Sequence, residues 1–211
     1  MRVVKEEEER RSEILDAAEK LFSEKGFDGT STNDILDEVG IARGTLYYHF
    51  KAKEDILDAM IDRITGRLIL KAKKIASKKE LPVMQRLTMT MISLNVDNDL
   101  GHEIMKQVHK PQNALMHQKM QEKMIASVNP VITELIMEAI SQGICQTEFP
   151  SEATEMILLY SNIAFDELAN LSDSERLVKI EGFIYNVERL LGMDRGSMRH
   201  TIFLTEKYMV R

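Results

Sequence analysis

Apolar residues recur at helical spacing along almost the whole chain of 211 residues, and this pattern limits the fold more than any other feature. Only 10 glycines and 4 prolines interrupt the chain, too few to punctuate a sheet of many short strands. The pattern therefore predicts an all-α protein. Near the start, five apolar residues form the stripe of an amphipathic helix: Ile14, Leu15, Ala18, Leu21 and Phe22.

Turn signals between the periodic segments predict where the helices begin and end. The first helix should end at Gly26, and Ser31 with Asp34 forms a capping-box pattern for a short second helix that ends at Gly40. A helical stretch over residues 43–50 follows, and a long helix then runs into the seventies. Later helices are expected near residues 82–95, 99–109, 113–142, 151–171 and 174–192, and Pro130 is placed to kink or split the third of these.

Composition and targeting signals bound the class of protein. The single Cys145 cannot form an intramolecular disulfide, which suits a reducing compartment. The N-terminus lacks the apolar stretch of a signal peptide, and no window reaches the roughly 18 apolar residues of a membrane span. We expect a cytoplasmic protein with no membrane partner.

The charge distribution at first argues against nucleic acid as a partner. The net charge is −6, and residues 1–60 hold nine Lys and Arg against fifteen Asp and Glu. Between Gly40 and Lys53, however, there are three basic residues and no acid. Because salt limits the reach of each charge to about 8 Å, this local positive field is enough to meet a DNA backbone.

Residues 32–50 have the dimensions of a DNA-reading helix-turn-helix. In the second helix Leu46 and Phe50 share one face and should point to the core, so the remaining side chains point outward. A major groove suits this outward face, because Gly44 permits close backbone approach and Tyr48 offers a hydroxyl. Four outward residues complete the set: Arg43 and Thr45 for bases, and Tyr47 and His49 for phosphates.

The stretch "STNDILDEVGIARGTLYYHFKAKEDIL" resembles the DNA-binding region of the TetR family of bacterial transcriptional regulators. The resemblance implies an N-terminal three-helix DNA-binding domain over residues 1–53 and a larger helical domain for effector binding and dimerisation over residues 54–211. The family often has a serine where this chain has Ala42, so one capping and phosphate contact is not transferred. The DNA contacts that it implies are Thr32, Arg43, Gly44, Thr45, Tyr47, Tyr48, His49 and Lys53.

An alternative is that Tyr47, Tyr48 and His49 pack in the core of an ordinary three-helix subdomain. Leu46 and Phe50 already fill the inward face, which favours DNA binding.

The two last long helices suggest a homodimer. One of them carries apolar residues at spacings of three and four, a coiled-coil-like seam, and the helix before it is similarly apolar. We expect an isologous contact through residues 151–192, although an ordinary buried helix pair is the alternative. The interface is predicted at Met156, Ile163, Leu177, Ile180, Ile184, Val187 and Leu191.

Eight methionines between residues 84 and 137 indicate a cavity that adapts to an apolar effector, although methionine also simply fills cores. The effector's identity stays open, and a hydrophobic molecule, cationic or aromatic, is the hypothesis. Its predicted lining is Met105, His109, Met120, Met124, Asn162 and Phe165.

Other chemistries are less favoured. His102, His109 and His117 do not match a metal-ligand spacing, and no nucleophile with a base, acid pair or phosphate loop is visible. We expect no metal, no cofactor and no enzyme activity. Three hypotheses remain: a ligand-responsive dimeric repressor of a near-palindromic operator, a DNA-binding protein whose helical domain binds another protein, and a small helical enzyme.

Overall fold

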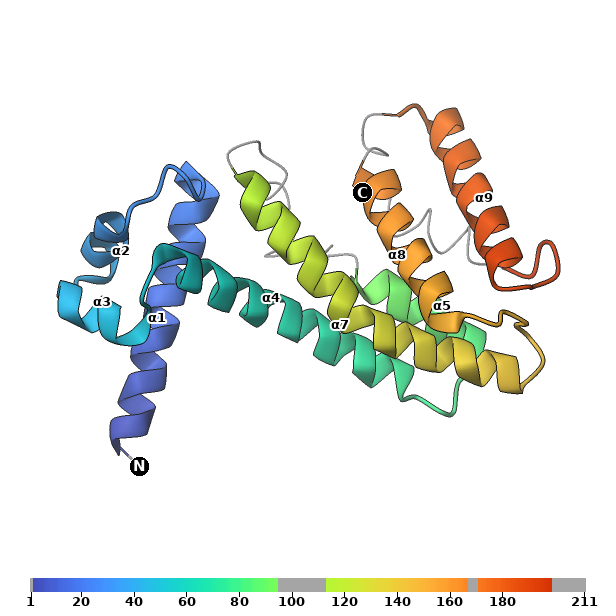
Figure 1. Cartoon of the computed structure of the whole chain (residues 1–211), viewed down its shortest axis with the longest axis horizontal. Helices are drawn as coiled ribbons and strands as arrows, with labels where there is room; N and C mark the ends of the chain where they lie inside the picture. Colours follow the sequence, from blue (N-terminus) through green and yellow to red (C-terminus); the bar gives the residue numbers. More distant parts are fainter. Residues whose placement is uncertain (1, 95–112, 167–170, 199–211) are drawn as a thin grey trace. The chain divides into compact units, whose positions relative to one another are not determined.

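The computed structural model describes residues 2–94, 113–166 and 171–198. Within these residues the chain forms helices and no strand, which confirms the all-α class (Figure 1). The helices are α1 (Arg2–Lys25), α2 (Thr32–Val39), α3 (Arg43–His49), α4 (Lys53–Ala76), α5 (Val83–Leu94), α7 (Ala114–Ser141), α8 (Pro150–Asp166) and α9 (Asp173–Leu190).

The predicted helices at 82–95, 113–142 and 174–192 correspond to α5, α7 and α9, with ends that differ by at most two residues. Pro130 lies inside α7, which continues as one helix, so the predicted alternative of two helices is wrong. The predicted helix at 99–109 lies outside the described residues.

Both ends of α2 have the capping structures that the sequence predicts. Ser31 and Asp34 make both bonds of a capping box, in which the Asp34 amide donates to Ser31 Oγ at 3.2 Å and the Ser31 amide donates to Asp34 Oδ2 at 2.8 Å. At the other end, Gly40 has a φ of 71°, and its amide donates to the Leu36 carbonyl at 2.9 Å. A side chain is strained at this φ, so glycine is the residue that ends the helix here.

The chain divides into two compact units, here named the head unit (residues 1–67 and 96–123) and the body unit (residues 68–95 and 124–211). Both α4 and α7 run without interruption from one unit into the other. The head unit includes the first parts of these two long helices, and the domain boundary expected after residue 53 stays a prediction.

The core of the head unit forms where α1 packs against α2 and α2 against α3. All five apolar residues of the predicted stripe in α1 are buried. Phe22 from that stripe meets Phe27 edge to face, with ring centroids 5.3 Å apart. The stripe thus determines which side of α1 carries the helix-turn-helix.

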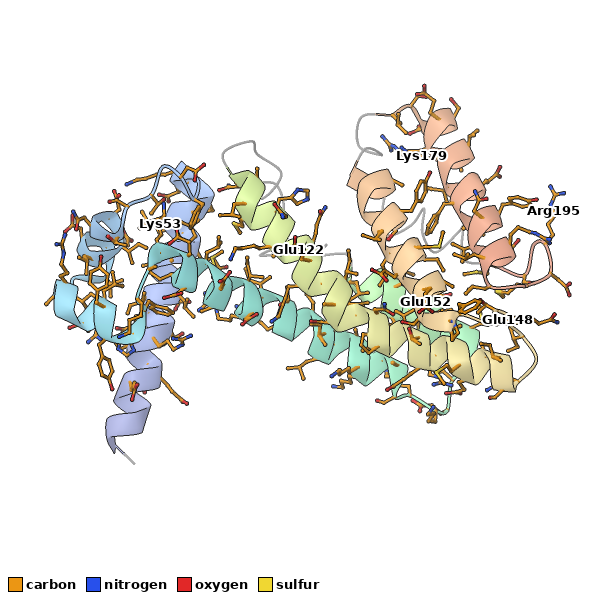
Figure 2. All side chains as sticks on the ribbon, in the orientation of Figure 1. Lys53, Glu122, Glu148, Glu152, Lys179 and Arg195 are labelled. Atoms are coloured by element: carbon orange, nitrogen blue, oxygen red, sulfur yellow. The ribbon has the colours of Figure 1, made fainter. Side chains whose placement is uncertain are left out.

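Lys53 joins the beginning of α4 to the turn between α1 and α2 (Figure 2). Its Nζ donates to the carbonyl oxygens of Phe27 at 2.7 Å and Thr30 at 2.9 Å, and lies 4.2 Å from the centroid of the Phe27 ring. Charge-assisted bonds to two carbonyls and a cation–π contact hold this turn in place.

The core of the body unit is built from α5, α7, α8 and α9. Seventeen buried residues of the described part of this unit form it, among them Leu87 of α5, Ile132 and Ile136 of α7, and Ile157 of α8. From α9 and the residue after it come Ile180, Ile184, Val187 and Leu191.

The position of these last four residues corrects the predicted dimer interface. Ile180, Ile184, Val187 and Leu191 are packed inside their own chain, so they are not available to a partner. The spacing of three and four identified one continuous face, and that face covers the protein's own core. Of the other predicted interface residues, Met156 and Leu177 are exposed, and nothing is described of the Ile163 side chain.

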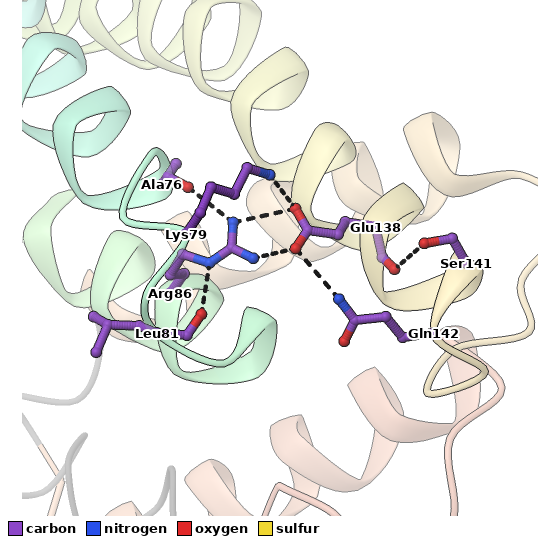
Figure 3. A network of polar contacts seen from close by, with 7 residues as sticks. All are labelled: Ala76, Lys79, Leu81, Arg86, Glu138, Ser141 and Gln142. Carbon is purple, nitrogen blue, oxygen red and sulfur yellow. Dashed lines mark hydrogen bonds and ion pairs between the residues drawn. The ribbon is translucent and has the colours of Figure 1, made fainter.

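A buried arginine ties three segments of the body unit together (Figure 3). Arg86 of α5 is 2% exposed and donates to the carbonyls of Ala76 at 3.0 Å and Leu81 at 3.1 Å, and its guanidinium pairs with Glu138 of α7. Lys79 also pairs with Glu138. The guanidinium of Arg86, with a smaller contribution from Lys79, lowers the pKa of Glu138 to about 2.

By length and composition alone α7 could cross a membrane, which differs from the expectation that no segment qualifies. Its apolar residues Val128, Ile132, Leu135 and Ile136 instead belong to the body core, and Glu138 on the same helix pairs with Arg86. Core packing accounts for these residues, although only 33% of the apolar stretch of α7 is buried.

Candidate nucleic-acid interface

The two faces of α3 separate as the sequence predicts. Leu46 is 1% exposed and Phe50 is 3% exposed, so both belong to the core. Tyr48 is 66% exposed and Tyr47 is 39% exposed. The hypothesis that these tyrosines pack in a core is therefore wrong, and their rings face solvent.

Gly44 lies on the exposed face of α3 in a place where glycine is not needed for folding. A Cβ added there would meet no atom of the chain within 4 Å, and its φ is not in the left-handed region. Because glycine lowers helix stability by roughly 0.5–1 kcal/mol relative to alanine, the missing side chain has a cost without a gain in packing. Glycine at this position is therefore explained by a partner surface that comes close to the backbone of α3.

Polar contacts fix the orientation of the outer side chains. Arg43 is exposed and its Nη2 donates to Asn33 Oδ1 of α2 at 3.1 Å. The rings of Tyr48 and His49 meet edge to face with centroids 5.1 Å apart. These contacts limit where the guanidinium and the rings can point, which favours a defined recognition surface over a flexible one.

The beginnings of the two helices differ in their caps. Ser31 caps α2, which leaves the half-buried Thr32 as its first residue. Ala42 precedes α3 and makes no side-chain cap bond, as expected for alanine. Thr45 is half-buried beside it, and its amide donates to the Ala42 carbonyl at 2.9 Å.

Two basic residues near the surface act within the fold. The ammonium of Lys53 is already engaged by Phe27 and Thr30, so a phosphate contact there would compete with bonds inside the head unit. Arg11 of α1 donates to the His49 carbonyl at 3.5 Å and lies 4.4 Å from the centroid of the Phe50 ring. Arg11 thus supports the last turn of α3, a role that no pattern in the sequence indicates.

Two acidic residues of α2 are paired with lysines of α1. Asp34 pairs with Lys25 at 2.7 Å, and Glu38 pairs with Lys20 at 2.7 Å. Bonds from Lys25 first and Ser31 second hold the pKa of Asp34 well below its ordinary value. Both acids are therefore neutralised by partners on α1. Each pair also uses one lysine, so the excess of acidic over basic residues in residues 1–60 is unchanged.

The predicted effector residues do not form a described site. Met105 and His109 lie outside the described residues, and nothing is described of the side chains of Asn162 and Phe165. Met120 is buried in the head unit, and Met124 packs at the edge of the body core. The predicted lining therefore remains a hypothesis.

Family matches cover both parts of the chain. Residues 14–60 match the family described as bacterial regulatory proteins, tetR family, and residues 96–182 match the family described as tetracyclin repressor-like, C-terminal domain. Together they cover more than half of the chain and occur in the order expected for such a regulator.

Curated relatives match the N-terminal part. HTH-type transcriptional repressor KstR2 of Rhodococcus jostii (strain RHA1) is 40% identical over 68 residues, which are 32% of this chain and 33% of that protein. An HTH-type transcriptional regulator of Staphylococcus aureus (strain USA300) is 36% identical over 96 residues, 44% of this chain and 52% of that protein. The chain spans about a third to a half of the length of the curated relatives it matches.

Solved structures share the whole fold at low identity. RolR in complex with resorcinol has a TM-score of 0.62 at 17% identity, covering 94% of this chain and 95% of that one. GusR of Salmonella enterica has a TM-score of 0.59 at 22% identity, covering 87% and 95%. A gamma-butyrolactone receptor has a TM-score of 0.58 at 16% identity, covering 97% and 98%.

The helix-turn-helix geometry, the outward face of α3 and the two family matches point to one conclusion. The chain belongs to the TetR family of bacterial regulatory proteins.

Proposed function

We propose that the protein is a homodimeric, cytoplasmic transcriptional repressor that binds a near-palindromic operator and is released by a small, mainly apolar effector. The observation that carries this proposal is the outward face of α3, where exposed Tyr48 stands next to Gly44, whose missing side chain the chain's own packing does not require. Such a face suits a surface that must approach the helix backbone closely.

The proposed DNA contacts follow from exposure. Gly44, Thr45 and Tyr48 meet base edges, and Arg43, held by Asn33, reaches a guanine. Backbone phosphates are contacted by Thr32, Tyr47 and His49. The phosphate contact predicted for Lys53 stays a hypothesis, since its bonds to the turn give it a structural use already.

For the dimer we propose the face of α8 and α9 that lies opposite the core. On α9, Val178 is 70% exposed and Tyr185 is 46% exposed, and Gly182 between them has open space where a Cβ would be. On α8, Met156, Leu159 and Tyr160 are exposed. An exposed apolar patch of this kind marks an interaction surface, and an isologous pair sets two α3 helices about one DNA turn apart, or ~34 Å.

For the effector we propose a neutral, mainly apolar molecule that carries a hydrogen-bonding oxygen. Thr90 of α5 is fully buried, and its hydroxyl has no hydrogen-bond partner within the part of the chain that the structure describes. A buried hydroxyl without a partner costs about 1–3 kcal/mol, which a ligand oxygen would recover. RolR with resorcinol and the gamma-butyrolactone receptor are the similar structures that support a small effector.

Selection from a random DNA library with the purified protein tests the proposal. An inverted repeat with half-sites about one helical turn apart is expected to be enriched. Enrichment of no sequence would contradict operator binding. A thermal-shift screen of neutral phenols and lactones against the complex then tests the effector, and operator binding without response to any compound would instead favour a body unit that binds another protein.

A further inference from the structure

Phe27, in the turn between α1 and α2, is held by three segments of the head unit. Its amide donates to Asn113 Oδ1 at 2.8 Å, its carbonyl accepts from Lys53 Nζ at 2.7 Å, and its ring packs edge to face on Phe22. The hydrogen-bonding groups of one backbone residue are thereby fixed from two distant parts of the sequence. The turn that leads into α2 cannot shift without breaking one of these bonds.

Asn113 is the most distant member of this set. It directly precedes α7, lies 86 positions from Phe27, and is 1% exposed. A buried amide loses its water on folding and is costly to leave without a partner, so this bond selects one position for the start of α7 relative to the turn.

Two ion pairs between α7 and α4 are more exposed and weaker. Lys119 of α7 pairs with Asp58 of α4 at 2.5 Å, and Lys123 pairs with Asp62 at 2.8 Å. Because such surface pairs contribute about 0–1 kcal/mol and are screened by salt, they guide α7 only loosely. The buried Asn113 bond is the specific contact.

We propose that Asn113 is a positioning residue for DNA binding, through which the start of α7 sets the geometry of the turn that leads into the helix-turn-helix. The same helix continues into the body unit, where Val128 and Ile132 lie in the core. A displacement of α7 along its axis therefore acts on the Phe27 amide. Because Ser31, the N-cap of α2, follows Phe27 by only four positions, the same bond fixes where α2 begins.

This inference rests on the proposed function, and three variants test it. Asn113→Leu has a similar volume but no acceptor, Asn113→Asp keeps an oxygen at the Oδ1 position, and Gln118→Leu removes an exposed amide from α7 as a matched control. Operator affinity is measured by fluorescence anisotropy, and exchange of the Phe27 amide by NMR.

We expect Asn113→Leu to bind the operator roughly 5- to 150-fold more weakly, the usual range for coupling between sites, and to lose protection of the Phe27 amide. Asn113→Asp should restore both properties, and Gln118→Leu should change neither. An Asn113→Leu variant that loses Phe27 protection but binds the operator as tightly as the unsubstituted protein would overturn the proposal.

A measurement on the unsubstituted protein keeps the proposal testable if Asn113→Leu does not fold. The Phe27 amide should exchange slowly, and more slowly still with the operator bound. Exchange at the rate of a free peptide amide would overturn the inference. If the unsubstituted protein binds no DNA while Phe27 is protected, the proposed function fails and not the Asn113 contact.

Discussion

Helices α3 and α9 each carry one face for the core and one exposed face, yet their sequences reveal these faces unequally. In α3 the outer face is polar and aromatic, so Leu46 and Phe50 mark the inner face unambiguously. In α9 both faces carry apolar residues, and the more regular stripe, which includes Ile184, is the buried one. The exposed face carries Val178 and Tyr185.

The difference shows what periodicity measures. The spacing of apolar residues shows which of them share one face of a helix. What that face packs against depends on the surfaces that the rest of the chain provides. A seam with coiled-coil spacing is equally good packing for a protein's own core and for a second copy.

The largest expected effect tests the assignment of the α9 faces. Ile184→Ala should lower the free energy of unfolding by about 2–5 kcal/mol, because it removes a buried side chain. Tyr185→Ala, one position further, should change unfolding of the protomer little but weaken dimerisation. Urea denaturation and sedimentation measure the two effects, and a reversed pattern would restore the interface predicted from the sequence.

A second substitution tests the outer face of α3. Gly44→Leu should lower operator affinity by about 1–3 kcal/mol, roughly 5- to 150-fold, because a side chain there blocks close approach. Gly66→Leu in α4 is the matched control, since a Cβ there also meets no atom within 4 Å. Both variants should stay folded in circular dichroism, and equal losses of affinity would refute the role of Gly44.

The unpartnered Thr90 hydroxyl gives a third comparison, within the described part of the body unit. Thr90→Val should raise the free energy of unfolding by about 1 kcal/mol and remove the thermal shift produced by an effector. Thr154→Val should instead destabilise, because the Thr154 hydroxyl donates to the Pro150 carbonyl at 2.7 Å. Destabilisation by both substitutions would show that Thr90 has a partner.

Ala42→Ser tests the missing cap of α3. The serine should stabilise the protein by about 1 kcal/mol and add a hydroxyl near the proposed phosphate contacts. Thermal unfolding and operator affinity are measured together. Unchanged values for both would show that the start of α3 is already satisfied by other groups.

The last prediction concerns pH and the polar contacts of the body unit. Arg86 and then Lys79 lower the pKa of Glu138 from its ordinary value of 4.5 to about 2. Stability from this carboxylate is therefore complete above about pH 4.5 and is lost as the pH falls toward 2. Glu138→Gln should be less stable than the unsubstituted protein near neutral pH, and the gap in thermal midpoint should narrow on acidification. A constant gap would contradict the linkage.

Much of the head unit was predictable from local chemistry. The cap by Ser31 and Asp34 and the glycine at Gly40 involve residues within a few positions of one another, so their types are sufficient to predict the turns. The inward position of Leu46 and Phe50 followed from the same local periodicity.

Contacts between distant residues were not predictable. Nothing in the sequence connects Asn113 to Phe27 or Arg86 to Glu138, because a buried polar bond depends on which helices pack together. The bonds of Lys53 were not predictable for the same reason. The family resemblance implied a phosphate contact for this residue and did not indicate its hydrogen bonds to Phe27 and Thr30.

The sequence by itself determined the all-α class, the helix-turn-helix and the outward face of α3, because these follow from residue types at short range. The tertiary structure alone decided which face of α9 is buried and which polar groups join the start of α7 to the turn at Phe27. Burial depends on the surface that a distant segment supplies, and one-dimensional spacing carries no information about that surface.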